Sequence, residues 1–155
     1  MRWFGLLLIV PLVAQAAPGE ILQVSVVSGS DTPQEYNLPL TEHNNQIDLR
    51  ERHRYHVAAK DLVRKRDVCR EDEYKTGLLL SIRPLGKSED NSQPVEVVGQ
   101  VSSIVSVADG QKLACGVNQV VKMKHQAFSD TVQVQPGRTK MVVIDGKYTV
   151  MLKLL

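Results

Sequence analysis

Apolar and polar residues alternate with a period of two along most of this chain, which is the pattern of a β-strand with one buried face. No segment has the helical spacing needed for the crossover helices of a parallel α/β fold. The pattern therefore predicts an all-β fold. Its alternating apolar positions are Leu22, Val24, Val26, Ile47, Leu49, Leu78, Leu80, Ile82, Val132, Val134, Met141, Val143, Tyr148, Val150, Leu152 and Leu154.

Turn-forming residues separate these stretches. Asp109-Gly110 and Asp145-Gly146 lie between strand-forming residues and favour type I′ hairpin turns. Pro136-Gly137 indicates a further reversal, and the polar segments 28–35 and 86–94 are typical of loops. We expect about nine strands, with at most one short helix, in an antiparallel β-sandwich of immunoglobulin-like size.

The segment 57–68 is ambiguous, because its apolar residues fit neither the strand period nor the helix period. A short helix is one interpretation. We favour a strand from Tyr55 to Ala59 followed by a charged loop.

Residues 1–16 have the features of a cleaved signal peptide. Arg2 precedes an apolar run from Trp3 to Ala14, and Ala14 and Ala16 are the small residues that signal peptidase requires. The run is shorter than the roughly 20 apolar residues that span a bilayer. Cleavage after Ala16 would leave residues 17–155 as a single domain. We expect a periplasmic or secreted protein with no integral membrane segment after cleavage.

Cys69 and Cys115 are the two cysteines of the chain. In an oxidising compartment such a pair predicts one disulfide. The bond would close a long loop and stabilise the fold by roughly 3 to 4 kcal/mol. Two cysteines without C-x-x-C spacing do not supply a tetrahedral metal site, so we expect no metal and no cofactor.

The charge pattern argues against a nucleic-acid partner. Loss of Arg2 with the leader lowers the formal net charge from +2 to +1, and acids are interleaved with the bases over residues 48–67. Neither feature creates a field strong enough to attract nucleic acid or an anionic membrane.

The histidines do not form a metal-binding pattern. His53 and His56 form an H-x-x-H, which places both side chains on one face of a helix but on opposite faces of a strand. His43 and His125 are isolated in the sequence. We interpret all four as ordinary surface or hydrogen-bonded histidines.

Catalytic motifs are absent from the sequence. It contains no Gly-x-Ser-x-Gly, and oxidised cysteines are not nucleophiles. The acid pairs Glu71 with Glu73 and Glu89 with Asp90 fall in segments that we expect to be polar loops, where water keeps carboxylates in their ordinary ionisation range. We therefore predict that the protein is not an enzyme.

The apolar C-terminal stretch suggests a binding function. Its alternating residues can form the second strand of a hairpin, and a free strand edge is a template for β-strand addition. We expect a non-enzymatic accessory module of a bacterial envelope assembly, such as a pilus or secretion apparatus, that binds another exported or envelope protein. The candidate edge residues are Tyr148, Val150, Leu152 and Leu154.

Two alternatives remain open. The chain could be a pilus subunit of the chaperone and usher type, which would donate the strand that carries Leu22, Val24 and Val26. Its charged content of 23% argues against that alternative. It could also be a periplasmic enzyme inhibitor that presents the loop 86–94.

Overall fold

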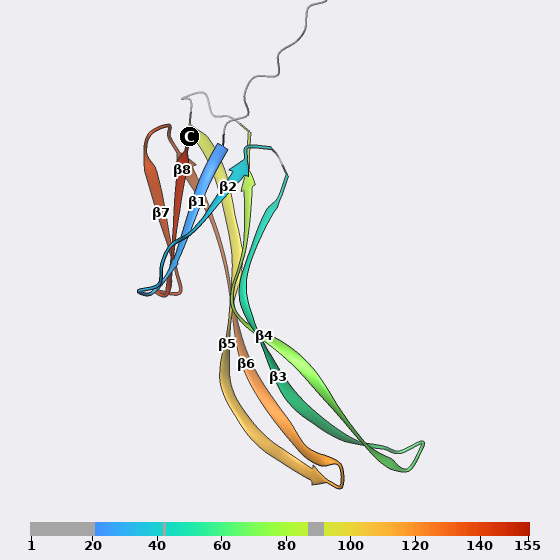
Figure 1. The fold of residues 1–155 in the computed structure, drawn as a ribbon. Coiled ribbons are helices and arrows are strands. Elements are labelled where there is room, and N and C mark those ends of the chain that lie inside the picture. Colours follow the sequence, from blue (N-terminus) through green and yellow to red (C-terminus); the bar gives the residue numbers. More distant parts are fainter. Residues whose placement is uncertain (1–20, 42, 87–91) are drawn as a thin grey trace, which may run out of the picture.

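A computed structural model of the chain describes residues 21–41, 43–86 and 92–155. The described residues form eight strands in two antiparallel sheets of four, without any helix (Figure 1). The predicted antiparallel β-sandwich is confirmed, with eight strands instead of nine. The strands are β1 (Ile21–Ser28), β2 (Gln34–Pro39), β3 (Asn45–Asp61), β4 (Arg66–Pro84), β5 (Gln93–Leu113), β6 (Gly116–Val134), β7 (Thr139–Ile144) and β8 (Tyr148–Leu154).

Two sequence predictions fall partly or wholly outside the described residues. The signal peptide, residues 1–16, lies outside them completely. The segment 86–94 is described only at Gly86 and over 92–94. No helix of the described part is long and apolar enough to cross a membrane.

The two sheets differ greatly in length. The small sheet has the order β2-β1-β8-β7 with strands of 6 to 8 residues, whereas the large sheet has the order β3-β4-β5-β6 with strands of 17 to 21 residues. The small sheet therefore covers only one end of the large sheet. Figure 1 shows this sandwich at the top, with the β3–β4 and β5–β6 hairpins extending below it as a two-armed projection.

The core lies between the two sheets and consists almost entirely of branched aliphatic side chains. Such side chains suit a pleated surface with one buried face. On β7 the buried residues are Val142 and Ile144, so Met141 and Val143 point away from the core. The predicted alternation on β7 is confirmed, but the residues predicted for the buried face, Met141 and Val143, lie on the outer face. The core residues are Leu22, Val24, Val26, Ile47, Leu78, Leu80, Ile82, Val95, Val97, Val101, Val134, Val142, Ile144, Val150, Leu152 and Leu154.

The β7–β8 turn has the predicted conformation. Asp145 and Gly146 have φ angles of 52° and 62°, and the backbone N of Lys147 donates a hydrogen bond to the Ile144 carbonyl at 3.1 Å. Two consecutive positive φ angles are the signature of a type I′ turn. The segment 28–35 likewise contains the β1–β2 connection, and Pro136-Gly137 lies between β6 and β7.

The turn of the β5–β6 hairpin differs from the prediction. Asp109 and Gly110 lie within β5, at an irregularity in its pairing with β6, and the reversal occurs at Ala114 and Cys115. The bulge absorbs the glycine that we assigned to a turn.

The ambiguous segment 57–68 contains no helix. β3 continues to Asp61, residues 62–65 form a short turn, and β4 begins at Arg66. The expected strand from Tyr55 to Ala59 is confirmed as part of β3. The charged loop is shorter than expected, because Glu71 and Glu73 are strand residues that stand opposite His56 and Arg54.

The two hairpins diverge at Gly77. Pairing of β4 with β5 runs from Pro84 opposite Val95 to Gly77 opposite Ser102 and ends there. Gly77 has a φ of +118°, and a Cβ at this position would lie 2.6 Å from the Leu49 carbonyl oxygen. Only glycine accepts this backbone angle without strain.

Beyond Gly77, the free edge of β3 meets β6. The side-chain oxygen of Gln119 accepts a hydrogen bond from the backbone N of His56 at 2.9 Å, and that of Asn118 accepts one from the backbone N of Ala58 at 3.1 Å. These amides satisfy strand-edge donors in place of a neighbouring strand.

Candidate functional site

The predicted binding edge on the C-terminal strand is wrong, because β8 is an interior strand. It pairs with β1 on one side and with β7 on the other. Val150, Leu152 and Leu154 are buried in the core, and Tyr148 packs against it. Burial of Tyr148 raises the pKa of its hydroxyl, and the nearby carboxylates of Glu51 and Asp145 raise it further.

The proposed donor strand is also an interior strand. Leu22, Val24 and Val26 lie in β1, which pairs with β2 and β8, and all three are buried. Donation to another subunit would have to remove this strand from the centre of its own sheet. The arrangement therefore gives no support to the pilus-subunit alternative.

The free edge of the C-terminal hairpin is β7. It pairs only with β8, so among the described residues its other edge has no neighbouring strand in the small sheet. Met141 and Val143 on its outer face are 62% and 61% exposed. Met141 stands opposite the partly buried Met151, so the apolar surface continues from the edge onto β8.

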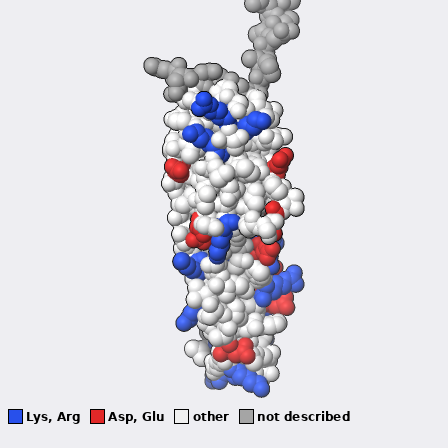
Figure 2. Space-filling model, turned by 90° about the vertical axis from the view of Figure 1, so that its left-hand side faces the viewer, with Lys and Arg blue, Asp and Glu red and all other residues white. Residues whose placement is uncertain are grey.

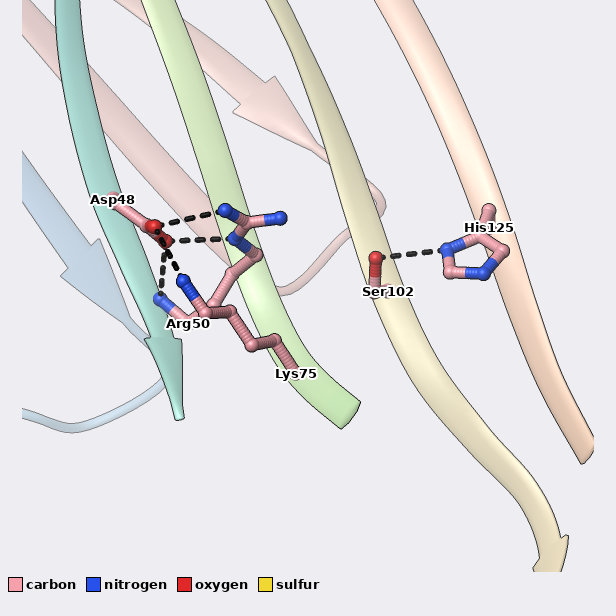
Figure 3. A network of polar contacts seen from close by, with 5 residues as sticks. All are labelled: Asp48, Arg50, Lys75, Ser102 and His125. Atoms are coloured by element: carbon pink, nitrogen blue, oxygen red, sulfur yellow. Dashed lines mark hydrogen bonds and ion pairs between the residues drawn. The ribbon is translucent and has the colours of Figure 1, made fainter. Parts of the chain in front are cut away.

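A single register row crosses the large sheet where the hairpins diverge. Arg50 stands opposite Gly77, Gly77 opposite Ser102, and Ser102 opposite His125. Ser102 is only 4% exposed, and its Oγ lies 2.9 Å from His125 Nδ1 (Figure 3). A serine hydroxyl within hydrogen-bond distance of a histidine is the arrangement of a nucleophile and its general base. Ser102 lies in a strand, however, and not in the strained turn that exposes a catalytic serine.

Asp48 forms the strongest charged contacts next to that row. Its carboxylate accepts hydrogen bonds from Arg50 Nε at 2.7 Å and Nη2 at 2.8 Å, and Lys75 Nζ lies 3.4 Å away (Figure 3). The Arg50 side chain lowers the pKa of Asp48 far below its usual range, and the pKa of Arg50 is raised in turn.

This charged contact continues as a cross-strand ladder down the β3–β4 hairpin. Arg54 Nε lies 3.5 Å from Glu73, and Arg52 and Arg54 lie 3.9 and 3.8 Å from Glu73 and Glu71. Exposed pairs of this kind contribute little stability individually. The pairs explain why acidic residues at these positions suit a strand: Glu73 faces Arg52 and Arg54 across the hairpin, and Glu71 faces Arg54.

A hollow of about 420 Å³ opens where the small sheet ends and the projection begins. Val26 and Tyr148 contribute from the small sheet, and Leu49, Thr76 and Ser102 from the large one. Its volume is within the range of small-molecule sites. Its lining also includes the charged residues Asp31, Glu51 and Lys147.

The predicted disulfide is confirmed near the tips of the hairpins. Cys69 of β4 and Cys115 in the β5–β6 turn are bonded, with their Cα atoms 6.0 Å apart. The backbone N of Ala114 donates a hydrogen bond to Asp67 Oδ2 at 3.0 Å beside the bond. The two arms of the projection are therefore joined at both the sandwich and the tips. The bond also indicates, in a general way, an oxidising and non-cytoplasmic environment.

The histidines take separate places. His53 stacks on Tyr74 with ring centroids 5.1 Å apart and contacts the Thr76 hydroxyl at 2.7 Å, while His56 lies near the disulfide. Among the described residues, no group of three or more His, Cys, Asp or Glu could hold a metal ion.

No family model matches the chain, and neither the curated proteins nor the solved structures include a match.

Two features were not predicted from the sequence: the Ser102–His125 contact and the outward position of Met141 and Val143. The first could be found only with the β5–β6 register, which two irregularities shift. The second had a signal in the sequence: Val142 and Ile144 alternate equally well, but only the structure shows which face meets the core.

Proposed function

We propose that this protein is an exported, non-enzymatic binding module of a bacterial envelope assembly, such as a pilus or secretion apparatus, and that β7 receives an extended segment of another exported protein. The observation that carries the proposal is the free edge of β7 beside exposed Met141 and Val143. An unpaired strand edge offers backbone donors and acceptors, and flanking apolar side chains add contact area and side-chain selectivity.

The surroundings of β7 favour a protein segment as the occupant. Figure 2 faces the side on which β7 lies in Figure 1, and over the sandwich it shows few charged side chains apart from a group of Lys and Arg near the upper end. An added strand would extend the small sheet and cover the apolar row that includes Met141 and Met151. Its backbone would pair with up to the six residues of β7.

The test is capture of partners from an envelope extract by wild type and by Met141→Lys/Val143→Lys. The substitutions are at exposed positions, so the sandwich should fold normally. An apolar strand that covered the lysines would have to desolvate their charges, which disfavours binding. Val105→Lys/Val107→Lys is the matched control, because both valines are exposed on β5 in the projection. We expect wild type and control to retain one exported partner, and the β7 variant to lose it at least tenfold.

Hydrogen exchange then locates the contact. In the complex, backbone amides of Thr139–Ile144 should gain protection, and a synthetic peptide of the partner segment should reproduce it. If the complex forms equally well with the β7 variant, the proposal that the partner binds the edge of β7 is refuted. If light scattering shows that wild type is a dimer and the β7 variant is a monomer, β7 binds a second copy of this chain and not a segment of another protein.

A further inference from the structure

The β3–β4 turn presents two adjacent aliphatic side chains at the far end of the projection. Leu62 and Val63 are 84% and 92% exposed. Asp61 fixes the turn, because its Oδ1 accepts hydrogen bonds from the backbone N atoms of Val63 and Arg64, both at 3.0 Å. A defined turn therefore holds an apolar pair away from the rest of the protein.

The acidic residues beside this pair are already engaged. The second Asp61 oxygen lies 3.9 Å from Arg64 Nε, and Asp67 binds the backbone of the other hairpin turn. Within the described residues, three exposed cations of the same tip have no ion-pair partner: Lys60, Lys65 and Arg66. The tip thus combines exposed aliphatic surface with unneutralised positive charge, although acids and bases are balanced along the sequence.

We propose that this tip, residues 60–66, binds the surface of an anionic lipid bilayer. Leu62 and Val63 enter the boundary between headgroups and acyl chains, while the unpaired cations contact lipid phosphates. The tip is a projecting turn and not a groove. It can enter a fluid lipid surface directly, whereas a protein partner would need a matching pocket.

The construction of the projection supports this role. The Cys69–Cys115 disulfide lies close to the tip and limits its motion, so binding orders little additional chain. β7 lies in the sandwich at the opposite end, so the inference is independent of the proposed protein partner.

Leu62→Trp gives a direct probe, because removal of residues 1–16 takes away the one tryptophan of the chain. With vesicles of phosphatidylcholine and phosphatidylglycerol, we expect its emission to shift to the blue and the shift to fall as salt is added. Vesicles of phosphatidylcholine alone should give a much smaller shift. Val105→Trp, in the middle of β5, should give none with either.

Sedimentation with the same mixed vesicles tests the two contributions separately. Leu62→Ser/Val63→Ser and Lys60→Gln/Lys65→Gln/Arg66→Gln should each weaken binding at least tenfold. The control Val105→Ser/Val107→Ser should bind as wild type. Absence of wild-type binding to mixed vesicles overturns the proposal, as does unchanged binding by both tip variants. Tip variants that lose an acidic protein partner but still bind vesicles would overturn it in favour of a protein surface.

Discussion

Gly99 stands opposite Phe128 in the β5–β6 ladder, and the phenyl ring lies over it. A Cβ on residue 99 would be 2.5 Å from Phe128 Cζ and 2.6 Å from the Leu79 carbonyl oxygen. The glycine thus leaves room for this partly buried aromatic side chain, which packs against the core. No other residue leaves enough space at this position.

We expect Gly99→Ala to lower the free energy of unfolding by about 1–3 kcal/mol, because the methyl group overpacks a closed contact. Urea unfolding of wild type and variant measures the difference. Adding Phe128→Leu should restore part of the loss, since the ring clash is relieved but the Leu79 carbonyl remains. An unchanged urea midpoint for Gly99→Ala would show that the ring does not occupy this place.

Removal of the disulfide tests how much the tip bond stabilises the fold. For a sequence separation of 46 residues, Cys69→Ser/Cys115→Ser should lose about 4 kcal/mol through the greater entropy of the unfolded chain. Wild type unfolded in the presence of reductant should match the double variant. A loss below about 1 kcal/mol would mean that the unfolded chain gains little freedom when the bond is absent.

The Ser102–His125 contact can be tested with a double-mutant cycle. His125→Ala leaves a buried hydroxyl without its side-chain partner, which should cost about 1–3 kcal/mol of unfolding free energy. Ser102→Ala/His125→Ala should cost less than the sum of the single changes. His43→Ala, in a surface segment, serves as the control. Additive losses would indicate that the two side chains do not interact in solution.

Asp48 should make stability sensitive to acid. Its pKa is lowered in the folded protein, chiefly by the Arg50 side chain, so its contribution is present above the unfolded pKa of about 4 and is lost as pH falls towards the folded value. Asp48→Asn should therefore lose less stability than wild type between about pH 5 and pH 2.

The expected size of this acid effect is below about 1 kcal/mol, because the pair is solvent-accessible and Arg50 is close in sequence even in the unfolded chain. Thermal unfolding across that pH range measures it. Parallel curves for wild type and Asp48→Asn would show that the ion pair contributes nothing to folding.

The fold class followed from local patterns, because alternation and turn chemistry act over a few residues. The alternation around Leu78, Leu80 and Ile82 indicated the strand β4 directly, and Asp145-Gly146 indicated the turn between β7 and β8. The long hairpins were harder to predict. Their outer halves carry charged residues on strands that no second sheet covers, so β4 from Arg66 onward resembles a loop in sequence.

Strand neighbours could not be predicted, because they depend on contacts between distant residues. β8 lies between β7, which directly precedes it in the sequence, and β1, which is the first strand of the described chain. The irregularities at Val105 and near Gly110 shift the β5–β6 register, so counting from any assumed turn misplaces His125 relative to Ser102. The candidate edge was therefore assigned to the wrong strand of the correct hairpin.

The described chain begins and ends at one place, where the backbone N of Leu155 donates to the Ile21 carbonyl at 3.0 Å, and the Cys69–Cys115 bond encloses the segment between those cysteines in a covalent ring. Tension applied to the two ends would pass from Cys69 through the sulfur atoms to Cys115. The outermost turn of the β3–β4 arm lies outside this ring and could be pulled open, whereas the β5 strand inside it would carry no load until the disulfide was reduced.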